Sequence, residues 1–253
     1  MKWFFESRAA VSRIAVIGAG ISGLQVADFL SSAGFQVEVF DRLSSCGGVW
    51  TENYVNLHTQ TPSELMQLPT YPMDSGRKRQ ATLSRQSFNE YIQEYAHDRN
   101  LYRFLNLSHT VQRISYQDKK IELTINGING TSLRLFDFVV IATGLFNEKK
   151  IPVLANESSF RGVVKHSCEL TDLSLVEGKH VIVVGYGKSA NDVAGEVSMQ
   201  AKTTTLVYRR LNWSIPYYLG GNKKRRFDRI ITNPFLLRLL IDRLPATQTP
   251  FER

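Results

Sequence analysis

The sequence is poor in cysteine, with two in 253 residues. Cys46 and Cys168 are too widely spaced for a Cys-x-x-Cys redox motif or a cysteine-ligated zinc site, and two thiols are too few for a disulfide scaffold. This scarcity argues against a disulfide reductase and predicts a reducing compartment, with a cytoplasmic location as the default. No metal site is expected.

Long apolar runs are also missing, since none approaches the roughly 18 residues of a membrane span. The apolar stretch near the N-terminus is interrupted by charge within a few residues, so residues 1–13 are interpreted as a short leader before the first strand, not as a signal peptide. Hydrophobic residues make up 43% and charged residues 21% of the chain, which is typical of a globular protein and excludes disorder.

The net charge of +8 is unevenly distributed. Residues 1–150 carry 16 basic and 14 acidic side chains, whereas residues 151–253 carry 15 and 9, including four consecutive bases at 223–226. Such an excess suits nucleic acid, an anionic membrane or a phosphate-bearing ligand. No aromatic residues interleave with the bases, so no nucleic-acid partner is expected. Residues 234–244 form an apolar stripe with two arginines, which leaves a membrane-surface helix and a packing helix as alternatives.

An apolar strand followed by a glycine turn occurs twice, and the first copy is complete. The run at 14–17 predicts a strand buried on both faces, and an amphipathic helix follows its turn. A second strand at 36–40 ends at Asp41, where a carboxylate can accept hydrogen bonds from a ribose. The turn itself has the G-x-G-x-x-G spacing, at Gly18, Gly20 and Gly23. These glycines allow the tight turn, the approach of a pyrophosphate and close helix packing, and the helix N-terminus supplies N–H donors.

The second copy keeps the first two glycines, Gly185 and Gly187, and has Ala190 at the third position. Its second strand, at 205–208, ends in Arg209 and Arg210 where the first copy has an acid. An acid repels a 2′-phosphate and an arginine can bind one. The first turn is therefore predicted to bind a nucleotide with a free ribose, and the second to bind NADP.

The intervening sequence supplies further elements. Phe88, Tyr91, Ile92 and Tyr95 form a helical stripe interpreted as core. Strands are predicted at 111–116 and 120–125, and a buried strand at 136–142. Residues 145–177, which include Pro152, form a connection. The predicted fold class is α/β, with two Rossmann-like dinucleotide-binding units built on parallel sheets, the second incomplete. The expected domains are an FAD-binding part at 1–150 and a partial NADP-binding part at 151–253.

With these motifs in this order, residues 14–216 resemble the flavin-containing monooxygenases, whose relatives include Baeyer–Villiger and N-hydroxylating monooxygenases. Besides the two glycine turns, the resemblance rests on a G-G-x-W segment, an A-T-G segment, an F-x-G-x-x-x-H fingerprint and an R-x-x-x-W-x-x-P segment. They correspond in turn to Gly47, Gly48 and Trp50; Ala142, Thr143 and Gly144; Phe160, Gly162 and His166; and Arg209, Trp213 and Pro216.

The resemblance implies an enzyme of the N,N-dimethylaniline monooxygenase type that uses FAD, NADPH and O₂. In that family NADPH reduces the flavin, which forms a C4a-hydroperoxide with O₂ and oxygenates a nucleophilic N or S atom of a small molecule. Gln60 would take the place of the family's asparagine beside the flavin and is the candidate catalytic residue. The implied cofactor-binding residues are Gly18, Gly20, Ser22, Gly23, Asp41, Gly48, Trp50, Thr143, Gly144, His166, Gly185, Gly187, Lys188, Ser189 and Arg209.

Several of these residues have a plainer interpretation. His166 is more simply a residue that holds a loop, and Trp50 suits flavin contact and core packing equally. The chain also departs from the family pattern, with Asp41 in place of the more frequent glutamate, Gln60 in place of asparagine and Leu170 in place of an aromatic residue. Its length is short for the family. The alternative to an active monooxygenase is therefore a truncated nucleotide-binding remnant without turnover.

Overall fold

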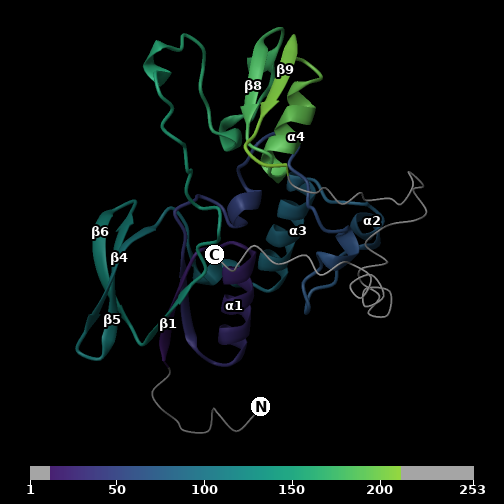
Figure 1. The fold of residues 1–253 in the computed structure, drawn as a ribbon. Helices are drawn as coiled ribbons and strands as arrows, with labels where there is room; N and C mark the ends of the chain where they lie inside the picture. The colour runs from purple at the N-terminus through teal and green to yellow at the C-terminus, as the bar shows by residue number, and fades with distance from the viewer. Residues whose placement is uncertain (1–11, 212–253) are drawn as a thin grey trace, which may run out of the picture. The chain divides into compact units, whose positions relative to one another are not determined.

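The computed structural model describes residues 12–211 (Figure 1). The basic run at 223–226, the apolar stripe at 234–244, the leader, Trp213 and Pro216 lie outside the described residues. Residues up to Val207 belong to one compact unit. The helices and strands are β1 (Arg13–Ile17), α1 (Ile21–Ser32), β2 (Gln36–Phe40), α2 (Ser75–Lys78), α3 (Arg85–Asp98), β3 (Leu105–Asn106), β4 (Thr110–Gln117), β5 (Lys120–Gly127), β6 (Gly130–Phe136), β7 (Phe138–Ile141), β8 (His180–Val184), α4 (Lys188–Val197) and β9 (Thr203–Val207).

The first glycine turn belongs to a parallel sheet with the strand order β3-β2-β1-β7. In β1, Ile14 pairs with Val37 of β2 on one side and with Phe138 of β7 on the other. The predicted parallel sheet at 14–17 is thereby confirmed. A strand in the middle of such a sheet can be apolar throughout because both of its faces are covered.

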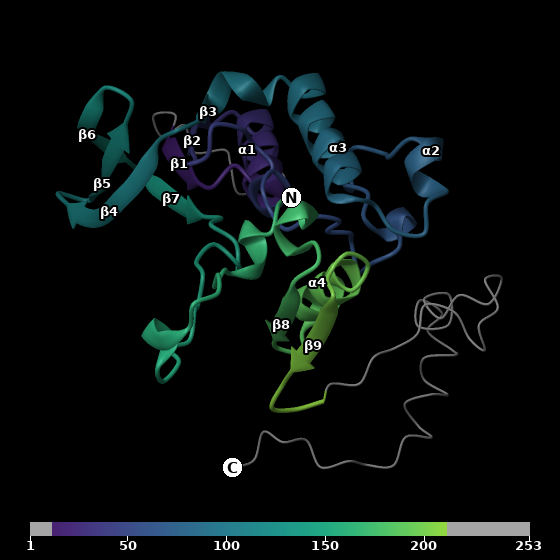
Figure 2. The same cartoon turned by 90° about the horizontal axis from the view of Figure 1, so that it is seen from above.

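The two faces of this sheet are covered by different layers, as Figure 2 shows. On one face, Val16 and Val39 pack with α1 and with the buried stripe of α3. On the other face, Ala15 and Phe40 pack against the antiparallel sheet β4-β5-β6. Phe88, Tyr91, Ile92 and Tyr95 are all buried, which confirms the predicted core stripe.

The second glycine turn lies between β8 and α4. Strand β8 pairs in parallel with β9, which confirms the predicted parallel pairing at 181–184. Helix α4 packs through Val193 and Val197 against Val183, whereas Ile182 and Val184 on the opposite face of β8 are exposed. The second unit therefore repeats the strand–turn–helix–strand order of the first in a sheet of two strands.

The prediction of one buried strand at 136–142 is wrong in two respects. Residue Phe136 ends β6, a third antiparallel strand that was not predicted, and β7 begins at Phe138. Phe138 and Ile141 are 58% and 66% exposed because β7 is an edge strand of its sheet among the described residues. Within the described part of the chain, every helix is too short or too polar to cross a bilayer.

Candidate functional site

The first glycine turn is fixed by its contacts with the neighbouring strand ends. The Gly18 N–H donates to the Phe40 carbonyl oxygen at 2.8 Å, and Gly18 has a φ of +110°, which glycine adopts without strain. A Cβ on Gly18 would lie 2.3 Å from the Ala142 carbonyl oxygen, and a Cβ on Gly23 would lie 1.8 Å from the Gly18 carbonyl oxygen. Gly18 and Gly23 are thus required by packing within the turn.

Gly20 has a different environment, because it faces a second glycine segment. A Cβ on Gly20 would meet nothing closer than the Gly48 Cα at 3.8 Å. The Gly47 N–H donates to the Ala19 carbonyl oxygen at 2.9 Å and holds the G-G-x-W segment against the turn. Beside this contact the Asn89 Oδ1 atom is buried and has no hydrogen-bond partner among the described residues. The structure therefore places Gly20 against Gly48, and the backbone at Gly18, Gly20 and Gly48 is half-buried.

Among the α-helices of the described residues, the two that follow the glycine turns begin differently from α2 and α3. Helices α2 and α3 are capped by Asp74 and Ser84, whose side chains accept hydrogen bonds from first-turn N–H groups. Helices α1 and α4 begin after Gly20 and Gly187, without a side-chain cap and without an acidic residue in the first turn. Their first N–H groups have no intrahelical acceptor and are oriented to bind an anion. Ser22 lies exposed in this first turn of α1.

Asp41 is engaged by the backbone of the turn that it follows. Its Oδ2 atom accepts a hydrogen bond from the Ala19 N–H at 2.6 Å, and its Oδ1 atom accepts one from the Leu43 N–H at 2.8 Å. Each carboxylate oxygen can accept a further hydrogen bond. Asp41 thus supports the glycine turn directly, a role that the sequence did not reveal, and its predicted contact with a ribose stays a prediction.

The second glycine turn has the same backbone pattern with one looser contact. The Gly185 N–H donates to the Val207 carbonyl oxygen at 2.8 Å, as Gly18 does to Phe40. A Cβ on Gly185 would lie 3.4 Å from the Cβ of Ala190, the residue at the third position of this turn, whereas a Cβ on Gly18 would overlap backbone. The ammonium of Lys188 forms an ion pair with Asp192, one helical turn further along α4, while Ser189 is exposed.

The hydrogen-bond register places the predicted 2′-phosphate residue, Arg209, one position beyond the counterpart of Asp41. Because Gly185 pairs with Val207 as Gly18 pairs with Phe40, the counterpart of Asp41 is Tyr208. Arg209 follows it and is exposed. The same offset appears in the residue count, since Arg209 lies 24 residues after Gly185 and Asp41 lies 23 residues after Gly18.

The remaining predicted residues occupy varied positions. Trp50 packs edge-on against Phe88, with ring centroids 4.7 Å apart, so its packing role is confirmed. His166 caps a short 3-10 helix. Its ring Nδ1 accepts a hydrogen bond from the Cys168 backbone N–H, and its backbone N–H donates to the Glu169 carboxylate, as expected of a residue that holds a loop. Gln60, Thr143 and Gly144 are exposed, like Ser22, Ser189 and Arg209.

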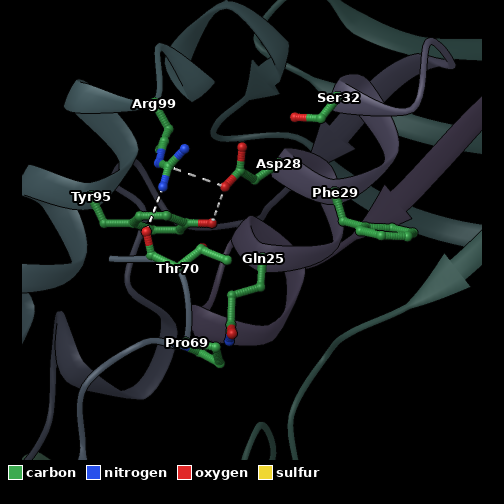
Figure 3. A pocket seen from close by; sticks show the side chains of 8 residues that line it. All are labelled: Gln25, Asp28, Phe29, Ser32, Pro69, Thr70, Tyr95 and Arg99. Atoms are coloured by element: carbon green, nitrogen blue, oxygen red, sulfur yellow. Dashed lines mark hydrogen bonds and ion pairs between the residues drawn. The ribbon is translucent and has the colours of Figure 1, made fainter. Parts of the chain in front are cut away.

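A pocket of about 340 Å³ lies elsewhere, along the later turns of α1 (Figure 3). None of the predicted site residues lines it. In Figure 3 the Tyr95 hydroxyl points at Asp28 and donates to its Oδ2 atom at 2.7 Å, and Arg99 lies beside the same carboxylate, with Nε 3.9 Å from that oxygen. These polar groups are hydrogen-bonded or ion-paired with one another and connect α1 to the end of α3. The pocket is therefore a structural junction, distinct from the glycine turns.

Sequence reasoning missed Tyr54 and Asp192. The Tyr54 hydroxyl donates to the Asp192 Oδ2 atom at 2.9 Å. Burial, and next the Asp192 carboxylate, raise the pKa of Tyr54, so the hydroxyl keeps its proton and acts as the donor. The spacing of Lys188 and Asp192 at i and i+4 was the available signal for the ion pair, but nothing in the sequence pointed to Tyr54.

Comparison with known proteins gives consistent matches. The model of a family described as flavin-binding monooxygenase-like matches residues 11–245. The 4-hydroxybenzoate brominase (decarboxylating) of Pseudoalteromonas luteoviolacea is 28% identical over 234 residues, which cover 92% of this chain and 45% of the relative. The trimethylamine monooxygenase of Pelagibacter sp. is 28% identical over 247 residues, which cover 87% of this chain and 56% of the relative.

Solved structures give the same result. The crystal structure of Tmm from Pelagibacter sp. superimposes with a TM-score of 0.73 at 27% identity, covering 81% of this chain and 53% of that one. The chain therefore spans about half the length of the relatives that it matches.

Proposed function

We infer the function of this chain from the flavin-binding monooxygenase-like family, to which it belongs. Members of the family use FAD and NADPH. We propose that FAD binds at the turn between β1 and α1, that NADPH binds at the turn between β8 and α4, and that the protein is a flavin monooxygenase acting on a small molecule with O₂. The division into an FAD-binding part at 1–150 and an NADP-binding part at 151–253 belongs to the same proposal.

The absence of caps on α1 and α4 is the observation that carries this proposal. A helix N-terminus without a side-chain acceptor leaves its N–H groups for water or for a ligand, and both such helices follow glycine turns. A dinucleotide supplies a pyrophosphate, whose charge the helix dipole favours. The free space at Gly20 and Gly187 supports the fit, since neither position has a neighbouring atom closer than 3.8 Å to an added Cβ.

The roles of the residues follow from this placement. The first-turn N–H groups of α1, including that of Ser22, would bind the FAD pyrophosphate, and Gly20 and Gly48 would let it approach the backbone. Lys188 and Ser189 would meet the NADPH pyrophosphate at α4. FAD, when bound, supplies the redox chemistry, taking hydride from NADPH and passing electrons to O₂. Gln60 would donate an amide hydrogen bond beside the flavin, and Trp50, Thr143, Gly144 and His166 would border the cofactors.

The choice of substrate rests on the relatives. We propose oxygenation of a nucleophilic N or S atom, because trimethylamine monooxygenase is among the relatives at 28% identity. Bromination of a phenol is the second candidate, because a 4-hydroxybenzoate brominase matches at the same identity over 92% of this chain. We also propose a cytoplasmic location, which the free thiols of Cys46 and Cys168 support.

Asp41→Ala should weaken FAD binding by about tenfold or more, because a charged acceptor at the end of β2 is lost. The same change removes the two backbone hydrogen bonds that Asp41 accepts. Hydrogen bonds to a charged group contribute about 1.5–3 kcal/mol each, so we expect a lower free energy of unfolding in a chain that still folds. Fluorescence titration with FAD and thermal unfolding measure the two effects.

Asp74→Ala is the matched control, because Asp74 also accepts two backbone N–H bonds, at the start of α2. This variant should keep the FAD affinity of the wild type. Equal affinities for FAD in wild type and Asp41→Ala would contradict the role of Asp41 at the ribose.

The proposed activity is tested by incubating the FAD-loaded chain with NADPH, O₂ and one of three probes: a tertiary amine, a thioether, or a phenol with bromide. We expect an N-oxide or S-oxide, formed in proportion to the NADPH consumed. A brominated phenol as the sole product would favour the second candidate. A chain that binds both cofactors and consumes no NADPH would instead be the nucleotide-binding remnant.

A further inference from the structure

The segment at 54–56, which follows the G-G-x-W motif, is attached to the second glycine unit by three hydrogen bonds. The Tyr54 hydroxyl donates to Asp192 at 2.9 Å, and the Asn56 Nδ2 atom donates to the Glu196 Oε2 atom at 2.6 Å. Between them, the Val55 N–H donates to the Leu170 carbonyl oxygen at 2.8 Å. Two of these acceptors lie one turn apart on α4, so the segment runs alongside the helix.

Burial makes this junction specific. Tyr54 is 3% exposed and packs in one apolar cluster with Leu170 and with Val193 and Val197 of α4. Its hydroxyl therefore cannot exchange Asp192 for water without leaving the cluster, and a buried donor without an acceptor is costly. Leu170 stands where the family has an aromatic residue. It belongs to this cluster and packs with Tyr54 there.

The carboxylate that Tyr54 contacts also controls the residues predicted to bind NADPH. Asp192 Oδ2 accepts from both the Tyr54 hydroxyl and the Lys188 ammonium. Loss of the Tyr54 hydroxyl would thus release one partner of Asp192 and change where the Lys188 ammonium lies at the start of α4.

The other end of the same segment contacts the first glycine turn. Gly48 lies six residues before Tyr54, and its Cα faces Gly20. Between them, the Thr51 carbonyl oxygen accepts a hydrogen bond from Arg85 of α3, and Trp50 packs on Phe88. One short stretch of chain, anchored along its length, therefore joins the two turns.

We propose that Tyr54 is a positioning residue that couples the two nucleotide sites. FAD bound against Gly20 and Gly48 would fix the segment at 48–56, and Tyr54 would then fix Asp192 and Lys188 for the NADPH pyrophosphate. This inference rests on the proposed function, since it requires both nucleotides to bind at these turns. Coupling of this kind is reciprocal: each nucleotide raises the affinity for the other by the same factor.

Calorimetric titration of NADP⁺ into the 253-residue chain, with and without saturating FAD, tests the proposal. NADP⁺ serves as the probe because it does not reduce the flavin. We expect FAD to raise the affinity of the wild type for NADP⁺ by about fivefold or more, as is typical of coupled sites. In Tyr54→Phe, which keeps the ring in the apolar cluster, the ratio of the two affinities should fall to near one while FAD still binds.

Tyr95→Phe is the matched control, because Tyr95 is equally buried, at 1% exposure, and also donates to a carboxylate, that of Asp28. This variant loses the same kind of hydrogen bond away from the junction and should keep the coupling of the wild type. Equal loss of coupling in both variants would mean that general destabilisation, and not the junction, is responsible.

Asp192→Asn supplies a second, independent test. It keeps an acceptor for Tyr54 but removes the charge that holds Lys188. The ratio of the NADP⁺ affinities with and without FAD should therefore also fall. The double variant Tyr54→Phe/Asp192→Asn should lose no more of the coupling than the single variant with the larger loss, because both changes act on one contact. A wild-type chain that binds FAD and NADP⁺ with no effect of one on the other would overturn the coupling and leave the proposed function intact. A chain that binds neither nucleotide would instead overturn the proposed function.

Discussion

Replacement of Gly23 by alanine is expected to abolish cooperative folding of the chain. The added Cβ would lie 1.8 Å from the Gly18 carbonyl oxygen, a backbone atom, and 3.5 Å from the Cβ of Ala142, the residue after β7. Relief of that overlap requires α1 to move away from β1, which opens the core around Val16 and Leu24. We expect a loss of about 4 kcal/mol or more in the free energy of unfolding, at the extreme of single substitutions. Far-ultraviolet circular dichroism during thermal unfolding measures it.

Gly20→Ala is the matched control within the same turn. Gly20 has an ordinary φ of −74°, and its added Cβ would be 3.8 Å from the Gly48 Cα, so this variant should fold like the wild type. It should nevertheless bind FAD less tightly, because the new methyl group occupies the surface that the pyrophosphate approaches. Similar stabilities of the two variants would contradict the assignment of Gly23 to packing and Gly20 to ligand approach.

Arg209→Ala is expected to weaken NADPH binding by about one to two decades and to leave NADH binding nearly unchanged. A guanidinium can form paired, charge-assisted hydrogen bonds to the 2′-phosphate, which NADH lacks. Such bonds contribute about 1.5–3 kcal/mol, and about 1.4 kcal/mol changes an affinity tenfold. Arg209 is exposed just after β9, beyond the carboxyl end of the strand, where open α/β sheets bind nucleotides. Calorimetric titration of each nucleotide into wild type and variant gives the two affinities.

Arg210→Ala serves as the control, because Arg210 lies one position further beyond the end of β9 and should contribute less. Since the hydrogen-bond register makes Tyr208 the counterpart of Asp41, the two variants also test whether the one-residue offset matters. Equal losses of NADPH and NADH affinity in Arg209→Ala would mean that Arg209 does not bind the 2′-phosphate. A larger NADPH loss in Arg210→Ala would move that role to the next residue.

The glycine turns were predictable from the sequence because their structure is local. An apolar strand, three glycines at fixed spacing and an amphipathic helix leave few alternatives, and the parallel pairing of β1 and of β8 follows from the right-handed connection between their strands. The sequence also indicated how the two turns differ, with glycine at the third position of the first and alanine at the third position of the second. Gly23 cannot accept a Cβ, whereas the third position of the second turn carries one, that of Ala190.

The features that the sequence did not reveal depend on contacts between distant residues. Strand β6 was missed because, as an antiparallel edge strand, it exposes Leu133 and Leu135 and lacks a clean alternation of apolar and polar residues. Tyr54 lies 138 positions from Asp192, so no local pattern could connect them. Asp41 was recognised for its position after β2, but its bond to the Ala19 N–H needed the folded turn.

Anaerobic addition of NADPH to the purified, FAD-saturated chain tests the central claim most directly, because it requires both glycine turns to bind their nucleotides in one molecule. We expect bound FAD to give a flavin absorption band that NADPH bleaches, with a much slower response to NADH. A folded chain that acquires no flavin band at saturating FAD, or one whose bound flavin stays oxidised in excess NADPH, would contradict the assignment of these two turns as a working pair.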